Sequence, residues 1–179
     1  MRFTSLSPSS IRSDIGNSYP DKEVMTGEIA TGHEGEMLTA NALGSCIAVV
    51  VHDPVMKVGG LAHVMLPGRA PSGTRSRKEL RYAEDATEEL LCRMEKMGAL
   101  KRNLRICLIG GGNVLRRDDD VICEMNVRSV RKAIEKKGLT IEAFSTGGYE
   151  RRRVRLNIAS GCVLCCVGSD AESVLMNGA

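Results

Sequence analysis

Two residues suited to nucleophilic chemistry stand in neighbouring apolar segments of this chain. Cys46 follows Leu43-Gly44-Ser45 and begins an apolar run that ends at Asp53-Pro54, and His63 lies near the end of the returning run 59–67. Thiolate is the nucleophilic form of cysteine, and a neighbouring imidazole favours its formation. The small residues before Cys46 leave room for a substrate. The residue types and spacing therefore indicate a cysteine nucleophile served by a histidine.

The two apolar runs predict a β-hairpin. A four-residue turn over residues 53–56, with Pro54 where its fixed φ is favoured, pairs Cys46 directly with His63. Their β-carbons would then lie roughly 4.5 to 5.5 Å apart on one face. An even-length loop keeps the pair on one face, whereas an odd loop or a bulge at Gly59-Gly60 would separate the two side chains.

The other two histidines are weaker partners for Cys46. His52 is further along the same strand, roughly 20 Å away at about 3.3 Å per residue. His33 lies in a glycine-flanked loop whose position the sequence does not fix. A structural interpretation also stays open, because free cysteine is often a small buried hydrophobe and His63 could be a core histidine.

Length and composition place the chain among one-domain globular proteins. It has 179 residues, no Trp, two Phe and three Tyr, so its core must be aliphatic and aromatic stacking on nucleic acid is not expected. The net charge of +3 is too small to indicate a polyanionic partner. Seven cysteines without an apolar leader indicate reduced thiols and a cytoplasmic protein. No stretch is apolar enough for membrane insertion.

Three further motifs could carry function. Cys162 and Cys165 form a CxxC, which is compatible with a thiol-redox pair or half a zinc site, but no second CxxC and no histidine lies nearby. The triple glycine 110–112 follows a strand, yet it lacks a phosphate-loop spacing, so a tight turn beside the active site is favoured. The arginine-rich run 151–155 is most simply a solvated strand face, with a docking patch for an acidic partner as the alternative.

The remaining pattern predicts the elements that position these residues. Residues 1–22 form a mobile N-terminal extension, and residues 23–179 form one domain. A first strand is expected over residues 24–30. A capping box of Ser76 and Glu79 predicts a helix that ends at Gly98. A second helix is expected over residues 126–137, closed by Gly138.

Further strands are expected over residues 104–109, 139–145, 152–159 and 162–167. Hairpins imply antiparallel pairing, and the element order indicates an α+β fold with helices on one side of sheet.

Several segments together resemble CheD, the chemoreceptor glutamine deamidase family of chemotaxis. The resemblance covers residues 23 to 167, and its most specific pieces are Leu43-Gly44-Ser45-Cys46 and Ala62-His63-Val64-Met65-Leu66-Pro67. The other segments that carry it are Val24-Met25-Thr26-Gly27-Glu28, Asp53-Pro54, Gly60-Leu61, Arg81-Tyr82-Ala83-Glu84-Asp85-Ala86, glycines 110–112 and Thr146-Gly147-Gly148. The resemblance implies a two-sheet α+β sandwich with helices packed on the outside, similar to the toxin deamidases, which are cysteine hydrolases.

The resemblance also implies a Cys, His, Thr catalytic triad. Cys46 and His63 take the first two roles by direct match. The family places its threonine just ahead of the LGSC motif, where this chain has Ala40-Asn41-Ala42, so two alternatives remain. Either the loop carries an extra residue and Thr39 orients His63, or Asn41 does so, as an amide does in papain-like sites. A second departure is Cys123-Glu124-Met125-Asn126, where the family usually shows Gly-x-Arg-Asn.

The implied activity is that of a protein-glutamine glutaminase without a metal or organic cofactor. The Cys46 thiolate attacks a receptor glutamine, and backbone N–H groups near Ser45 and Cys46 hold the oxyanion while His63 moves the protons. Ser45, Gly44 and Asn41 are expected to support the oxyanion site. The resemblance further implies methylesterase activity on receptor glutamyl esters and binding of the phosphatase CheC. The alternatives are a non-catalytic adaptor for receptors or CheC, and a redox or zinc protein that uses Cys162 and Cys165.

Overall fold

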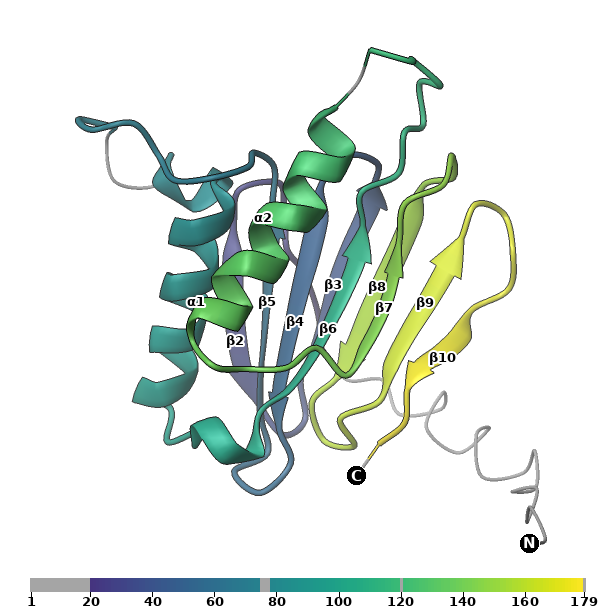
Figure 1. Ribbon diagram of the computed structural model, residues 1–179. Coiled ribbons are helices and arrows are strands. Elements are labelled where there is room, and N and C mark those ends of the chain that lie inside the picture. The colour runs from purple at the N-terminus through teal and green to yellow at the C-terminus, as the bar shows by residue number, and fades with distance from the viewer. Residues whose placement is uncertain (1–19, 75–77, 120, 179) are drawn as a thin grey trace, which may run out of the picture.

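The computed structural model describes residues 20–74, 78–119 and 121–178, and its strands form two five-stranded sheets (Figure 1). Sheet A contains, in spatial order, β1 (Asp21–Glu23), β3 (Met37–Leu43), β8 (Arg152–Asn157), β9 (Val163–Val167) and β10 (Ser173–Met176). Sheet B contains β2 (Ile29–His33), β5 (Val58–Val64), β4 (Ile47–Asp53), β6 (Arg105–Gly110) and β7 (Ala143–Thr146). Each sheet has one parallel pair, β1 with β3 and β6 with β7, and its other pairs are antiparallel.

Two α-helices, α1 (Ala83–Lys96) and α2 (Ile122–Lys136), lie on the face of sheet B that is turned away from sheet A (Figure 1). Short 3-10 helices, η1 (Glu79–Arg81) and η2 (Lys101–Asn103), flank α1 in the sequence. The glycines that follow the two α-helices have positive φ, +90° at Gly98 and +62° at Gly138, as expected of left-handed stops. The α+β sandwich expected from the sequence is confirmed.

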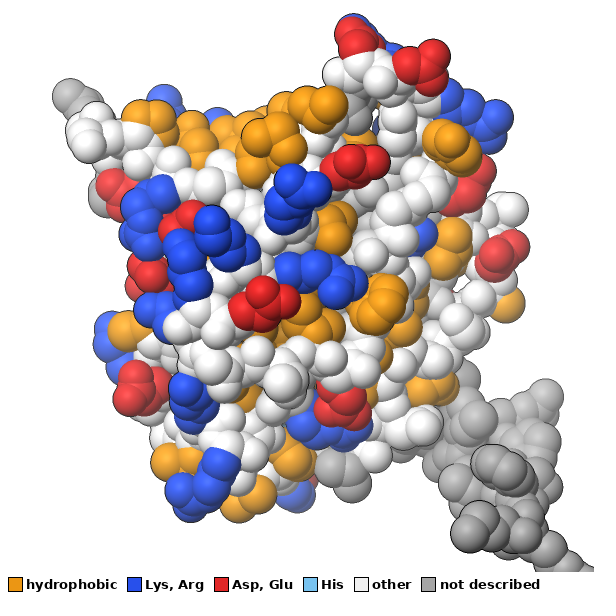
Figure 2. Space-filling model, viewed as in Figure 1, with side chains coloured by type: hydrophobic (Ala, Val, Ile, Leu, Met, Phe, Trp, Pro, Cys, Tyr) orange, Lys and Arg blue, Asp and Glu red, His pale blue; other side chains and the backbone are white. Residues whose placement is uncertain are grey.

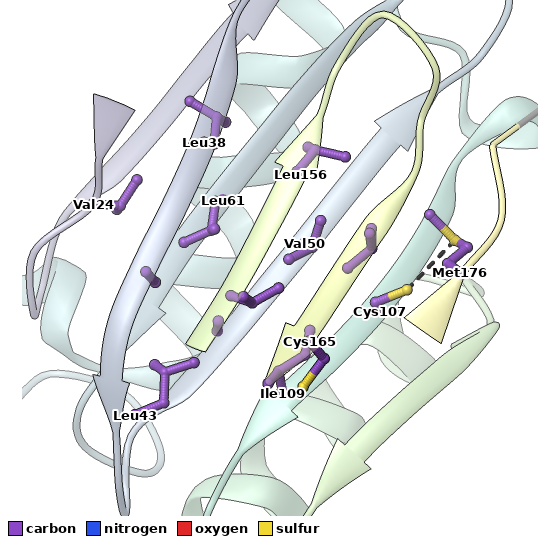
Figure 3. Packing of buried hydrophobic residues seen from close by; sticks show 14 of the residues in the cluster. Val24, Leu38, Leu43, Val50, Leu61, Cys107, Ile109, Leu156, Cys165 and Met176 are labelled. Atoms are coloured by element: carbon purple, nitrogen blue, oxygen red, sulfur yellow. Dashed lines mark hydrogen bonds between the residues drawn. The ribbon is translucent and has the colours of Figure 1, made fainter. Parts of the chain in front are cut away.

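Two hydrophobic cores hold these layers together. In β4, Ala48 and Val50 face sheet A, whereas Val49 and Val51 face the helices, and all four are buried. The core between the sheets is aliphatic and sulfur-rich, and in Figure 3 the Cys107 thiol meets the Met176 sulfur at 3.4 Å. Because β4 is buried on both faces, its sequence is a continuous apolar run rather than an alternating one.

The Gly59-Gly60 pair lets sheet B approach both of its neighbours. A β-carbon at Gly59 would lie 2.8 Å from Leu156 of sheet A, and one at Gly60 would lie 2.6 Å from Leu90 of α1. The pairing of β4 with β5 runs without interruption from Asp53 with Val58 to Ile47 with Val64. The glycine pair therefore holds no bulge and serves close packing instead.

The predicted strand over residues 24–30 is wrong over residues 24–28, because a turn at Thr26-Gly27 separates β1 from β2 and Gly27 has a φ of +79°. Only Ile29 and Ala30 belong to a strand, β2. The predicted N-terminal extension 1–22 lies outside the described residues as far as residue 19, but Asp21 and Lys22 belong to β1 and pair with β3. The folded domain therefore begins before residue 23.

The predicted helices begin at other residues than expected. Ser76, half of the predicted capping box, lies outside the described residues, and α1 itself begins after Tyr82, which makes no side-chain cap. Helix α2 begins about a turn earlier than predicted, at Ile122. Strand β10 was not predicted, because its short sequence carries only four residues of weak alternation.

Acidic and basic side chains are interspersed over the helix-covered face (Figure 2). The arginine-rich run 151–155 is not one continuous patch: Arg152 is buried and donates to the Ser145 hydroxyl at 2.9 Å, while Arg153 and Arg155 pair with Glu172. Strand alternation explains this division, because neighbouring residues of β8 face opposite sides. None of the described helices is long and apolar enough to cross a membrane.

Candidate active site

Cys46 lies immediately before β4, at the end of the sandwich where β6 also ends. Its backbone carbonyl accepts a hydrogen bond from Gly111 N–H at 2.9 Å, and the Gly44 carbonyl accepts one from Gly112 N–H at 2.8 Å. A β-carbon at Gly110 would lie 2.1 Å from the Cys46 carbonyl oxygen. Gly110 therefore lets the end of β6 lie against the cysteine segment, as expected, but the turn that follows falls at residues 114–115 rather than at the glycines.

The Cys46 side chain is half-buried and lines a pocket of about 250 Å³. The other lining residues are Ala42, Gly44, Ser45, Gly112, Val114, Leu115 and Arg151. The small residues expected to leave room beside the thiol thus do line an opening to it. The other two histidines lie at the opposite end of sheet B, far from Cys46. His33 pairs with Val58, and the buried His52 pairs with Gly59.

The predicted hairpin register is wrong by one residue in each strand. The loop contains residues 54–57 rather than 53–56, so His63 pairs with Ala48 and Cys46 is displaced by two residues along the neighbouring strand. The displacement arises because Asp53 pairs with Val58 and Lys57 adopts a positive φ of +50° within the turn. Since the loop still has an even length, Cys46 and His63 keep the same face, as diagonal rather than direct neighbours, with Cα atoms roughly 7 to 8 Å apart.

The His63 ring is held by the segment that precedes β2. Its Nδ1 lies 3.1 Å from the Val24 carbonyl, and since a carbonyl can only accept, Nδ1 carries the proton and Nε2 keeps the lone pair. The Thr26 hydroxyl lies 3.5 Å from Nε2. The backbone N–H and C=O of His63 pair with Glu28 and Gly27, which fastens this segment beside the ring.

The two residues considered for the third catalytic position lie elsewhere. The Thr39 hydroxyl donates to the Asp21 carboxylate, and Asn41 donates to Glu23 at 2.8 Å. Because Leu38 and Ala40 face the core between the sheets, Thr39 faces the opposite side of sheet A. Neither residue forms a hydrogen bond with His63 among the described residues.

The loop before the cysteine motif does carry an irregularity. The pairing of β3 with β8 shifts between Ala40 and Leu43, and Ala42 has a positive φ of +54°. This is a β-bulge, which accommodates an extra residue ahead of Gly44-Ser45-Cys46. The bulge adds one residue to β3 relative to β8, and Thr39, which precedes it, bonds Asp21 rather than His63.

Electrostatics favour an uncharged resting pair. Burial raises the pKa of the Cys46 thiol, an effect partly offset by a hydrogen bond from its own backbone. Burial lowers the pKa of His63, opposed by its bond to Val24 and by the charges of Glu23 and Glu28. Both shifts disfavour the charged forms, so near neutral pH the resting site holds thiol and imidazole rather than thiolate and imidazolium.

The two cysteines of the CxxC motif, Cys162 and Cys165, do not line the Cys46 pocket. Among the described residues, which include all seven cysteines, no disulfide is formed. Cys165 is buried in the core between the sheets, whereas Cys162 is half-buried just before β9. Among the described residues, no three His, Cys, Asp or Glu side chains gather as a metal-binding group.

Sequence reasoning missed two residues at this end of the molecule. Thr26 was read as part of a strand, and nothing in its spacing from His63 indicated a contact. Asn126 is fully buried in α2, and its Nδ2 donates to the Ser45 and Met65 carbonyls at 2.9 and 3.0 Å. The signal that could have found it was the asparagine retained in Cys123-Glu124-Met125-Asn126.

The fold and the site define an α+β sandwich protein with a thiol and a neutral imidazole at one end, an arrangement suited to acyl transfer. The sequence model of a protein family described as CheD chemotactic sensory transduction matches residues 65–166. The chain is 44% identical to a probable chemoreceptor glutamine deamidase CheD of Chlorobium luteolum over 85% of this chain and 75% of that protein. It is 36% identical to chemoreceptor glutamine deamidase CheD of Thermotoga maritima over 80% of this chain and 89% of that protein.

A third relative, the probable deamidase CheD of Methanococcus maripaludis, is 33% identical over 85% of this chain and 98% of its own length. The crystal structure of Bacillus licheniformis hypothetical protein YfiH is 10% identical in sequence, with a TM-score of 0.41. The match covers 74% of this chain and 61% of that chain, and it is too weak to assign a fold family. The chain belongs to the CheD family.

Proposed function

We propose that this protein deamidates glutamine side chains of chemoreceptors to glutamate, through a thioester on Cys46. The observation that carries the proposal is that Cys46, just before β4, and His63 of β5 share one face of sheet B, with the Cys46 side chain lining an open pocket. Membership of a family whose relatives are named chemoreceptor glutamine deamidases supports this choice of substrate. The proposal includes a cytoplasmic location and a fold related to the cysteine hydrolases.

The chemistry begins from the neutral pair. Nε2 of His63 takes the thiol proton as the Cys46 sulfur attacks the side-chain carbonyl carbon of glutamine. Backbone N–H groups of Ser45 and Cys46 are proposed to hold the developing oxyanion, with Gly44 leaving space for the approach. The imidazolium then gives its proton to the departing amine, and ammonia leaves a glutamyl thioester.

Hydrolysis completes the cycle at the same two residues. His63 takes a proton from water as the water oxygen attacks the thioester carbonyl, and the proton returns to the sulfur as the thioester bond breaks. Glutamine and water become glutamate and ammonia, so the reaction balances without a cofactor. The same attack on a glutamyl methyl ester would release methanol, which accounts for a proposed methylesterase activity.

Thr26 is the hydroxyl that geometry favours for the third position of the site. It lies beside the lone pair that must accept the Cys46 proton, and after transfer its oxygen can accept the new Nε2–H. Thr39 and Asn41, bound to Asp21 and Glu23, would then support β1 and the bulge rather than the imidazole.

Exposed apolar side chains around Cys46 favour a protein substrate over a small molecule. Leu115 is 72% exposed and lines the Cys46 pocket. Three methionines are also exposed near the site: Met25 lies between Val24 and Thr26, Met65 is two residues after His63, and Met125 precedes Asn126. Figure 2 shows hydrophobic side chains along the upper edge of the molecule, near the N-terminal end of α2. Methionines suit a surface that receives several related sequences, and we propose that the receptor segment carrying the glutamine docks here.

The deciding experiment incubates the protein with a receptor cytoplasmic fragment and follows amide-to-acid conversion by mass spectrometry. Conversion by the native protein and none by Cys46→Ala is expected. Conversion that persists in Cys46→Ala would refute the mechanism.

The second candidate function is a non-catalytic adaptor that binds receptors or the phosphatase CheC. Two observations favour the adaptor. Burial shifts the pKa values of Cys46 and His63 toward their uncharged forms, so the resting site lacks a thiolate nucleophile. No hydrogen bond joins Cys46 to His63 among the described residues. Receptor binding by the native protein without any conversion would select the adaptor over the deamidase. CheC binding is compatible with both candidates and is measured separately, with purified CheC.

A further inference from the structure

We infer that Asn126 is a positioning residue that sets the spacing between Cys46 and His63. The inference rests on the proposed function only for its kinetic consequence, because its structural basis is independent of the substrate. Asn126 lies in the second turn of α2, whose N-terminal end reaches the edge of sheet B where β6 ends (Figure 1).

The Asn126 amide bridges the two segments that carry the reactive residues. Its Nδ2 donates to the carbonyl of Ser45, the residue before Cys46, at 2.9 Å and to the carbonyl of Met65, two residues after His63, at 3.0 Å. Both acceptors are carbonyls, so only the amide nitrogen can occupy this position and the orientation of the side chain is determined.

The Asn126 hydrogen bonds lie just beyond the point where the pairing of β4 with β5 ends. The last residue pair of β4 and β5 is Ile47 with Val64, so Ser45 and Met65 lie beyond the ladder. One side-chain amide replaces the missing interstrand bonds there. Because Cys46 and His63 are diagonal neighbours, a small opening between the strand ends would carry the thiol away from the imidazole.

The oxygen of the Asn126 amide indicates a role other than stability. Oδ1 of Asn126 is buried and has no hydrogen-bond partner among the described residues. A buried acceptor without a partner is costly, and an apolar side chain of the same size would avoid that cost. The position is therefore better suited to holding the two carbonyls than to stabilising α2.

The test replaces Asn126 by Leu, which keeps the volume and removes both donors. The matched control is Asn157→Ala, because Asn157 is also buried and holds two backbone N–H groups, but at the opposite end of sheet A. Alkylation of Cys46 by iodoacetamide at pH 7 is followed by peptide mass spectrometry, with half-buried Cys92 as an internal reference.

Alkylation of Cys46 in Asn126→Leu is expected to slow by about tenfold or more, to the rate of His63→Ala, because the imidazole no longer reaches the thiol. Asn157→Ala should alkylate like the native protein. Thermal denaturation of each variant separates reactivity from folding. If Asn126→Leu does not fold, Asn126→Asp carries the same test, since a carboxyl group, ionised or protonated, cannot donate to both carbonyls.

Equal Cys46 alkylation in Asn126→Leu and native protein, or equal slowing in Asn157→Ala, would overturn the inference. In the deamidation assay, Asn126→Leu should lose about 10²-fold in kcat with KM unchanged, as expected for a displacement near 1 Å. If the native protein shows no deamidation but Cys46 alkylation still depends on Asn126, the positioning role stands and the proposed function fails.

Discussion

Substitution of Gly110 by Ala should displace Cys46 and remove most of the activity. The new β-carbon would lie 2.1 Å from the Cys46 carbonyl oxygen, whereas such contacts are essentially never below 3.0 Å. The obstacle is backbone, so no flexible side chain can yield, and the cysteine segment must move by about 1 Å. A displacement of that size costs about 10²-fold in rate.

Gly35→Ala is the matched control for this substitution. Gly35 also has a positive φ, +92°, but a β-carbon there meets nothing within 4 Å and lies at the other end of the sandwich. Gly35→Ala should therefore lose about 1 to 2 kcal/mol of stability through backbone strain alone, and Gly110→Ala should lose more, because its clash adds to the strain. Only Gly110→Ala should also lose activity.

The assay for both glycine variants combines chemical denaturation with deamidation of a receptor fragment at saturating concentration. Comparison at equal folded fraction isolates the effect on kcat. If Gly110→Ala, once folded, deamidates as fast as Gly35→Ala, the contact between the triple glycine and Cys46 does not position the nucleophile, and the reasoning fails.

Four further predictions follow from the same geometry. Thr26→Val should reduce kcat by about tenfold or more, whereas Thr39→Val should leave kcat within about twofold and lower only stability; the reverse order in receptor-fragment kinetics would restore Thr39 to the site. Burial lowers the pKa of His63 and raises that of Cys46, so the rate of Cys46 alkylation should increase in two steps as the pH rises. The first step, as His63 loses its proton, should have a midpoint below about pH 6.5, and the second, as Cys46 ionises, should come above about pH 9. A plateau without the second step would indicate a thiolate–imidazolium pair. Asp53 is fully buried, and although burial opposes it, hydrogen bonds from the Leu100, Met56 and Val55 N–H groups lower its pKa. Asp53→Asn should therefore lower the free energy of unfolding in urea at pH 7 by about 1 to 3 kcal/mol, and this loss should shrink as the pH falls below about 4. A loss that is unchanged at pH 3 would contradict this prediction. Leu115→Glu should raise KM for the receptor fragment by about tenfold with kcat unchanged, and an unchanged KM would argue against docking at the Cys46 edge.

The sequence was most informative where one residue type has one physical consequence. Gly98 and Gly138 ended the helices because only glycine adopts positive φ without strain, and the apolar run after Cys46 formed a central strand because both of its faces are buried. The shared face of Cys46 and His63 followed from an even loop length alone. The register did not, because Lys57 took a left-handed conformation that its residue type does not announce.

The rest of the site depends on contacts between segments that are distant in sequence. Thr26 reaches His63 because its segment pairs with the backbone of β5, and Asn126 reaches Ser45 because α2 lies across sheet B. No local periodicity encodes either approach. The bulge between Ala40 and Leu43 shows the same limit, because it is defined only by the pairing of β3 with β8.

Trapping of the proposed thioester is the most direct test of the account. The protein is mixed with a receptor cytoplasmic fragment, quenched in acid during turnover, and digested for peptide mapping by mass spectrometry. The account predicts a receptor glutamyl group joined to Cys46 through a bond that hydroxylamine cleaves, and no such species with Cys46→Ser. Deamidation that proceeds at full rate without any adduct on Cys46, and continues in Cys46→Ser, would contradict it.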